Sequence, residues 1–422
     1  MAGLSGHQCV QIYGFPPQLH QALISAAGNR RLALVGGAVR DLLLHRVHRD
    51  PWRDLPDLDL VVEGDAAELL DRLNLDPRLC ILRAQRHGAF GTAEVEVALP
   101  TSEADPGDSW VLDLASARSE RYAQPGANPI PQLGSLDQDL ARRDFTVNAI
   151  ALLLWPTASS TELLDPHGGQ RDLQQRTLRF LHHHSVQDDP TRLIRGARYA
   201  ARLHFDLAAE SQRQAKETLR AWPWLWHHGD PPGEAPPSLS TRLRMEMELL
   251  LDREPWQQGI ELLQAWGGLQ LLDPQLQDDS FWRRRIFWAQ RLGLPRLPAL
   301  LAGAADPLAA AQRLQIPHRH YKLLSQFQEL RSRLDRISEG MCCSDWCNWL
   351  EAPGSTPEAV ALAIACGLKP RRPLLRWWCR WRFLRAPVTA KDLMALEQLQ
   401  PGRELGERLH QLRRERLDQE RV

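Results

Sequence analysis

Acidic residues in the first third of the chain have the spacing of a phosphoryl-transfer site. Asp57 and Asp59 lie two residues apart in a stretch typical of a strand, where both side chains point to the same face. Asp113 lies in a later stretch of the same kind. Carboxylates that converge from neighbouring strands repel one another unless cations lie between them, as in a two-metal site. Taken alone, an Asp-x-Asp pair is more often a solvated strand end.

A glycine pair is the second candidate feature. Gly36 and Gly37 separate a buried apolar run from a helical pattern. Backbone N–H groups at the start of a helix face an anion at close range when no side chain intervenes, which suits a triphosphate. A glycine pair before a helix is more commonly only a turn.

The segment 142–149 is the third candidate. Arg142 and Arg143 are followed closely by Asp144 and Asn148. Guanidinium, carboxylate and amide groups in one short stretch match the phosphates and ribose of a nucleotide. A helix start with incidental charges is the alternative interpretation.

The elements that must position these groups change in character along the chain. Apolar and alternating runs predict strands at 31–35, 57–62, 93–98, 110–114 and 150–155, with a helix at 38–44. From residue 190 onward the pattern is helical, interrupted by a proline-rich linker at 230–237. We therefore expect an α+β head with a mixed sheet and flanking helices, followed by an all-α region.

The composition is that of an ordinary globular protein. The chain has 422 residues, 43% hydrophobic and 25% charged, with 52 Lys plus Arg against 52 Asp plus Glu, which excludes collagen-like, coiled-coil and disordered classes. No apolar run reaches the roughly 18 to 20 residues of a membrane-spanning helix, and residues 1–9 lack signal-peptide features. We expect no membrane partner and a cytoplasmic location. Seven cysteines predict free thiols in a reducing compartment.

Basic and aromatic residues alternate in one segment near the C-terminus. Arg376, Arg380 and Arg382 lie among tryptophans at 377, 378 and 381. Arginine on phosphates with aromatic stacking suits RNA. An amphipathic helix whose tryptophans belong to the core is equally compatible with the pattern.

Two clusters of metal-ligating residue types are weaker candidates. Three consecutive histidines occupy 182–184, and we expect surface side chains there rather than a metal site. Cys342, Cys343 and Cys347 lack a fourth ligand at zinc-like spacing, which favours buried thiols.

The order and spacing of these motifs resemble one enzyme family. The Gly-Gly-x-Val-Arg-Asp turn, the Asp-x-Asp strand and the Arg-Arg-Asp-Phe-Thr-x-Asn-Ala segment are followed by motif-like stretches at 165–173 and 188–199. Together they resemble the class II tRNA nucleotidyltransferases and bacterial poly(A) polymerases, in the DNA polymerase β-like superfamily. The likeness is firm over 32–250 and thin beyond.

The resemblance implies a role for each matching position. Two Mg²⁺ ions are expected on Asp57, Asp59 and Asp113, the catalytic carboxylates, and the substrates are CTP and ATP. Asp189 and Arg192 are expected to read the base, although Asp188 stands where many members have glutamate. The full set of expected nucleotide-binding residues is Gly36, Gly37, Arg40, Arg143, Asp144, Asn148, Asp189, Arg192, Arg195 and Arg198.

The resemblance also implies a fold and a domain order. We expect an N-terminal extension at 1–26, a nucleotidyltransferase head of the polymerase β type at 27–160, a neck with base-selecting helices at 161–229, a helical body at 238–335, and a helical tail at 336–422 that binds tRNA through Arg376, Arg380 and Arg382.

The implied activity is template-independent addition of C, A or both to the 3′ end of tRNA. Poly(A) polymerase is the alternative within the family, because it shares every motif. A catalytically inactive RNA-binding protein is the alternative from another class, and three retained carboxylates count against it. The motifs do not distinguish CCA, CC or A addition, and the oligomeric state is not predicted.

Overall fold

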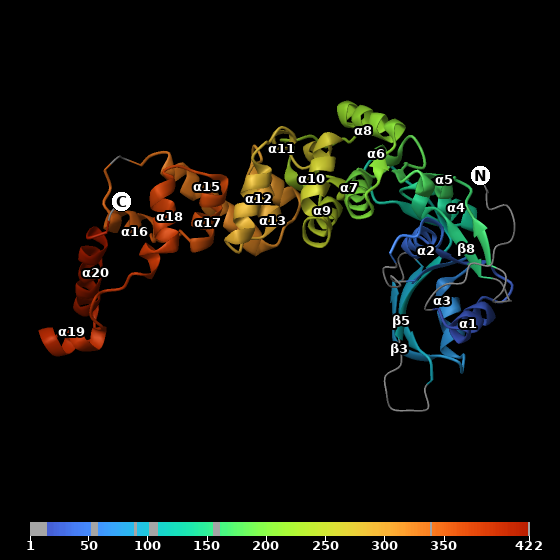
Figure 1. The fold of residues 1–422 in the computed structure, drawn as a ribbon, viewed down its shortest axis with the longest axis horizontal. Helices are drawn as coiled ribbons and strands as arrows, with labels where there is room; N and C mark the ends of the chain where they lie inside the picture. Colours follow the sequence, from blue (N-terminus) through green and yellow to red (C-terminus); the bar gives the residue numbers. More distant parts are fainter. Residues whose placement is uncertain are drawn as a thin grey trace. The chain divides into compact units, whose positions relative to one another are not determined.

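The fold consists of two units that meet in sequence between Leu225 and Trp226 (Figure 1). The computed structural model describes residues 15–51, 58–87, 91–100, 109–154, 161–337 and 340–420. Asp57, one of the expected metal ligands, lies outside the described residues. All other expected site residues of the head and neck belong to the first unit.

A mixed seven-stranded sheet forms the centre of the first unit. Its strand order is β3-β4-β5-β2-β1-β8-β9, and β2 and β5 run parallel while the other neighbours are antiparallel. The strands are β1 (Leu32–Val35), β2 (Leu58–Val62), β3 (Cys80–His87), β4 (Thr92–Ala98), β5 (Ser109–Ser116), β8 (Ala151–Leu154) and β9 (Thr161–Leu164).

Side-chain alternation explains how this sheet is buried. Leu58 and Leu60 of β2 point to one face, and helix α3 (Ala66–Asn74) contacts the sheet and packs against α1 (Pro17–Ala27). Val61 belongs to another cluster, with Ala33 and Val35 of β1 and two leucines of α4 (Leu136–Ala141). Since Asp59 lies two residues before Val61, it faces the α4 side.

Further helices and short strands complete the first unit. Helix α2 (Gly37–His48) follows β1 directly, and a 3₁₀ turn (Thr146–Asn148) precedes β8. The remaining elements are β6 (Arg118–Arg121), β7 (Ile130–Leu133), α5 (Gly169–Gln174), β10 (Thr177–Leu178), α6 (Ser185–Asp188), α7 (Thr191–Leu203), β11 (Asp206–Leu207) and α8 (Ala209–Ala221).

The second unit is helical. Helix α17 lies at its interior, because Ala359 to Ala365 are all buried and α12, α15 and α18 contact it. Its α-helices are α9 (Thr241–Arg253), α10 (Trp256–Ala265), α11 (Pro274–Gln277), α12 (Trp282–Arg291), α13 (Arg296–Leu301), α14 (Pro307–Arg313), α15 (His318–Leu334), α16 (Cys343–Leu350), α17 (Pro357–Cys366), α18 (Arg371–Cys379), α19 (Ala390–Glu397) and α20 (Arg403–Asp418).

The expected fold class is confirmed: a mixed sheet with helices is followed by an all-helical region. The division into five domains stays a prediction. The proline-rich stretch at 230–237 contains short 3₁₀ turns, at Pro232–Glu234 and from Pro237. Among the described helices, none combines the length and the apolar character that a membrane span requires.

Gly169, at the start of α5, provides a test of the packing next to the candidate site. A Cβ atom there would lie 2.3 Å from the main-chain oxygen of Thr146 and 2.7 Å from Cγ1 of Ile150. We expect Gly169→Ala to lower the free energy of unfolding by about 1 to 3 kcal/mol in urea titrations, because backbone must move. Gly406→Ala in α20, where nothing lies within 4 Å, is the control, and equal effects of the two substitutions would contradict this account.

Candidate active site

Three acidic residues lie side by side across neighbouring strands. Asp59 of β2 pairs with Asp113 of β5 in parallel register, and Asp113 pairs with Glu94 of β4 in antiparallel register. Paired positions point to the same face, and all three residues are partly exposed and line one open pocket of about 330 Å³. The expected proximity of Asp59 and Asp113 is therefore present.

The glycine turn lies next to two residues that line this pocket, Asp59 and Arg143. Gly36 has φ 71°, and a Cβ there would lie 2.8 Å from Oδ2 of Asp59 and 3.3 Å from Nη1 of Arg143. A side chain would thus fill the space where backbone, carboxylate and guanidinium meet. Gly37 begins α2, so its N–H belongs to the helix N-terminus, as a phosphate-binding turn requires.

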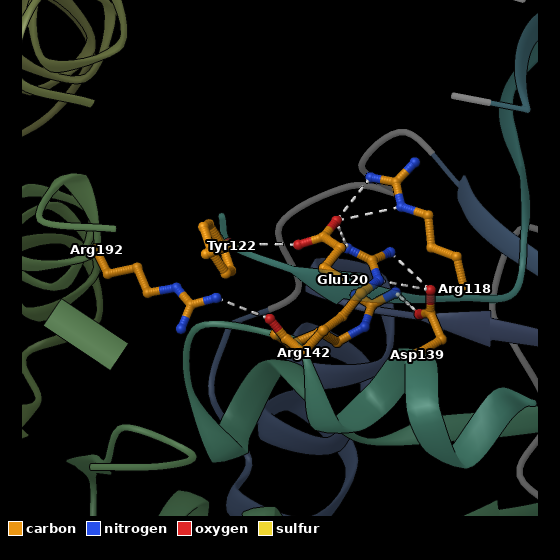
Figure 2. Close-up of polar contacts among 7 residues, drawn as sticks. Arg118, Glu120, Tyr122, Asp139, Arg142 and Arg192 are labelled. Atoms are coloured by element: carbon orange, nitrogen blue, oxygen red, sulfur yellow. Dashed lines mark hydrogen bonds and ion pairs between the residues drawn. The ribbon is translucent and has the colours of Figure 1, made fainter. Parts of the chain in front are cut away.

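Asp139 and Glu120 hold the arginine pair in place (Figure 2). Asp139 is fully buried, and its Oδ1 accepts from Nε of Arg142 at 2.9 Å while its Oδ2 accepts from Nη2 of Arg143 at 3.0 Å. Burial acts to raise the pKa of Asp139, but the charges of Arg143 and Arg142 outweigh it and lower that pKa. Glu120 of β6 accepts from Arg142 and from Arg118, both at 3.0 Å.

Asp144 joins three elements through buried polar contacts. Its Oδ1 accepts from Nδ2 of Asn148 at 3.0 Å, and its Oδ2 lies 2.8 Å from Nη2 of Arg195 in α7. Asn148 in turn accepts from Nη1 of Arg40 in α2 at 2.9 Å, and Arg40 also pairs with Asp41. The structure thus brings together four expected nucleotide-binding residues, and it joins them to one another.

The expected base-reading pair lies at the start of α7. Oδ1 of Asp189 accepts from the main-chain N–H and the hydroxyl of Thr191, at 3.0 and 2.6 Å. Nη2 of Arg192 donates to the main-chain oxygen of Arg142 at 2.9 Å, which Figure 2 shows. Both residues are buried, 4% and 5% exposed, so their polar groups are shielded from bulk water. Burial raises the pKa of the adjacent Asp188.

The histidine triplet only partly meets its expectation. His183 and His184 are exposed, but His182 is half-buried and its Nε2 lies 3.2 Å from Nη1 of Arg192. Burial, with the positive charge of Arg192 as the next cause, lowers the pKa of His182 to about 4. The expectation of three surface side chains is wrong for His182, because its ring is covered where it meets the arginine.

The basic segment near the C-terminus divides between core and surface. Trp377 and Trp381 are buried, so these tryptophans belong to the core of the second unit. Arg382 stacks over the ring of Trp378 at 3.7 Å, and Arg380 pairs with Glu420 at 2.9 Å. The RNA-binding role of the arginines stays a prediction.

The described cysteines are free thiols, as expected. Cys343 and Cys347 are buried, and burial raises the pKa of Cys347 to about 12. Within the residues that the structure describes, no group of three or more His, Cys, Asp or Glu side chains has the geometry of a metal site. The expected carboxylate triad includes Asp57, which lies outside those residues.

Three supporting residues escaped the sequence analysis. Glu94, Glu120 and Asp139 all carry charges that contact or adjoin the expected site residues. Alternation in β4 gives a signal for Glu94, because buried residues at 93, 95 and 97 leave 94 on the open face. Asp139 lies three and four residues before the arginines, a helical spacing that allows ion pairs.

Comparisons with known proteins give one consistent result. The model of the poly A polymerase head domain matches residues 32–179. The CC-adding tRNA nucleotidyltransferase of Deinococcus radiodurans is 37% identical over 308 residues, which are 71% of each chain. The A-adding tRNA nucleotidyltransferase of the same organism is 36% identical over 152 residues, 35% of this chain and 31% of that one. The Thermotoga maritima CCA-adding enzyme complexed with tRNA shares the fold, with TM-score 0.66 at 22% identity, over 96% and 91% of the two chains.

Asp144 provides a test of the buried network. Asp144→Asn removes the charge that pairs with Arg195. Because the side chain of Arg195 is 37% exposed and water screens the pair, we expect a loss of about 1 to 2 kcal/mol at pH 7, which is less than for a fully buried pair. Burial acts to raise the pKa of Asp144, but the charges of Arg195 and Arg192 and the Asn148 hydrogen bond outweigh it and lower that pKa. The carboxylate therefore contributes to the free energy of unfolding at pH values above its ordinary pKa, about 3.9. This contribution is lost as the pH falls through the pKa of the folded state.

Urea titrations of parent and variant between pH 8 and 3 measure this difference. The gap in unfolding free energy should stay constant down to about pH 4 and then narrow, because protonation neutralises the parent's carboxylate. A gap that widens as the pH falls would contradict the sign of the shift.

Proposed function

The chain belongs to the class II tRNA nucleotidyltransferase and poly(A) polymerase family, and on that premise we propose that it adds C residues to the 3′ end of tRNA. The tRNA nucleotidyltransferases of this family extend tRNA with C, with A or with both, so the nucleotide substrates come from the set of CTP and ATP, and tRNA is the partner. The proposal concerns which nucleotide this chain adds and which residues carry the reaction.

One observation supports the reaction: Asp59 and Asp113 lie in register on parallel strands, facing Arg143 and the Gly36 turn. Carboxylate oxygens are the ligands that Mg²⁺ prefers, so these residues fit the metal. In the proposed site Asp57, Asp59 and Asp113 would hold two Mg²⁺, which would supply activation of the 3′ hydroxyl of the tRNA and charge stabilisation for the leaving pyrophosphate.

The remaining groups position the nucleotide. The backbone of Gly36 and Gly37 and the guanidinium of Arg143 bind the triphosphate, so that the tRNA hydroxyl can attack its α-phosphate. Asp139 keeps Arg143 pointed at the Gly36 turn through its ion pair. The glycine turn and helix α7 are held in position by a further set of residues: Arg40, Asp144, Asn148, Arg195 and Arg198.

Asp189 and Arg192 select the base. A carboxylate accepts from the exocyclic amino group of cytosine or adenine, and a guanidinium donates to their ring nitrogen or carbonyl. Uracil and guanine place a carbonyl where Asp189 needs a hydrogen-bond donor, and an N–H where Arg192 needs an acceptor. Each mismatched buried group costs about 1 to 3 kcal/mol, which favours C and A.

The extent of sequence similarity favours C over A. The match to the CC-adding enzyme of Deinococcus radiodurans extends over about twice the length of the match to the A-adding enzyme of the same organism. In this proposal Arg376, Arg380 and Arg382 of the tail bind tRNA. Poly(A) polymerase activity and an inactive RNA-binding protein are the alternatives that the experiments below exclude or support.

Asp59 provides the test of catalysis. Asp59→Asn should reduce nucleotide addition by about 100-fold or more while leaving tRNA affinity unchanged, because a metal ligand stabilises the transition state and not the bound RNA. Asp71→Asn, whose side chain is 60% exposed on α3, is the control and should keep full activity. Addition by Asp59→Asn at the rate of the control would remove Asp59 from the site.

Transcripts of tRNA with different 3′ ends test the choice of nucleotide. We expect two C residues to be added with CTP alone to tRNA that lacks its CCA end, and no addition of A to tRNA that ends in CC. Gel separation of the products distinguishes the outcomes. Addition of A to the CC end would make the enzyme CCA-adding, long A tails on unrelated RNA would make it a poly(A) polymerase, and binding without addition would make it inactive.

A further inference from the structure

Two acceptors from separate segments hold the guanidinium of Arg192. Its Nη2 donates to the main-chain oxygen of Arg142 at 2.9 Å, and its Nη1 lies 3.2 Å from Nε2 of His182. Because the two contacts use different nitrogens, they restrict rotation of the guanidinium plane. Each Nη nitrogen carries two hydrogens, so one on each remains for a base.

The contact with His182 requires a neutral imidazole. Arg192 carries only donors, so Nε2 must offer a lone pair, with the proton on Nδ1. Burial, with the charge of Arg192 as the next cause, lowers the pKa of His182 to about 4, so the ring is neutral near pH 7. The charged and titratable groups around the ring include Arg192 itself, His183, His184 and, beside Arg192, Asp188.

The main chain fixes the position of this ring. The carbonyl of His182 accepts from the side chain of Gln214 in α8 at 2.9 Å and from the N–H of Ser185 at 3.1 Å. His183 and His184 are exposed and have no contact with Arg192 among the interactions described for this part of the chain. Within the triplet, His182 is the one placed as an acceptor.

We propose that His182 is a positioning residue for base selection, which sets the orientation of Arg192 by accepting one of its N–H groups. This rests on the proposed base-reading role of Arg192. His182 does not touch the nucleotide in this account. It limits the directions in which Arg192 can donate. The arginine therefore has no alternative rotamer in which it could donate to a base whose hydrogen-bonding edge does not match.

A purely structural role for His182 makes a different prediction. Loss of packing would lower stability and reduce turnover of every nucleotide by a similar factor. Loss of an orienting acceptor would instead reduce the ratio of kcat/KM for CTP to that for UTP, because a looser arginine can also donate to uracil. This ratio therefore separates the two roles.

Two substitutions isolate the acceptor. His182→Phe keeps a ring but removes the lone pair, and His182→Gln places a carbonyl oxygen close to the position of Nε2. On tRNA lacking its CCA end, we expect the CTP to UTP ratio to fall roughly five- to tenfold in His182→Phe, the effect of one hydrogen bond, and to return within about threefold of the parent in His182→Gln. His183→Phe is the matched control and should leave the ratio unchanged, since His183 is exposed.

The outcomes separate this inference from the proposed function. An unchanged ratio in His182→Phe, or an equal loss in His182→Gln, overturns the role of His182. If His182→Phe fails to fold in thermal melts, His182→Ala provides the acceptor-free variant.

Arg192→Ala is measured alongside the His182 variants. If it keeps the parent's CTP to UTP ratio, base reading by Arg192 is wrong and the inference about His182 is wrong with it. If it loses the ratio while the His182 variants keep it, the inference alone is wrong.

Discussion

The buried carboxylate of Asp144 is the interaction on which the arrangement of the first unit depends. A charge that is removed from water must be paired and hydrogen-bonded, or folding loses several kcal/mol. Asp144 meets this requirement through Asn148 beside it and Arg195 on α7, and Asn148 extends the contact to Arg40 on α2. Helix α2, which follows the glycine turn, and helix α7, which begins at the proposed base-reading residues, are therefore held to the same short segment.

This coupling has a consequence for the reaction. In the proposed mechanism the α-phosphate must lie beside Asp59 while the base lies beside Arg192, so the distance between strand β2 and helix α7 has to match one nucleotide. Asp139 and Glu120 add to the constraint, because they hold Arg142, whose carbonyl accepts from Arg192. Planar guanidinium groups suit such positions, since one arginine can bind two acceptors in fixed directions.

The sequence predicted those parts of the fold that have a strong local pattern. Apolar runs located β1, β2, β4, β5 and β8, and the glycine pair located the start of α2. Strand β3 was missed, because seven of its eight residues are exposed or polar and its register depends on β4 rather than on its own periodicity. The proximity of Asp59 and Asp113 followed from alternation and strand order. The contacts of Glu120 and His182 could not be predicted, because each joins segments that are separated in sequence or turned by a loop. Asp139 differs, because its spacing of three and four residues from the arginines is a local signal.

Arginine content was the least informative part of the sequence, and buried arginines explain why. Arg313, 2% exposed, donates to the carbonyls of Leu239, Leu271 and Leu272, and burial lowers its pKa only to about 10, so it stays charged. Arg285 donates in the same way to the carbonyls of residues 299 and 300. Such arginines satisfy the carbonyls left at helix ends and turns, where no N–H of the backbone is available. Arg192 makes this contact too, with the carbonyl of Arg142. What distinguishes it from a structural arginine is its place in the sequence three residues after the buried Asp189, with which it forms the proposed base-reading pair.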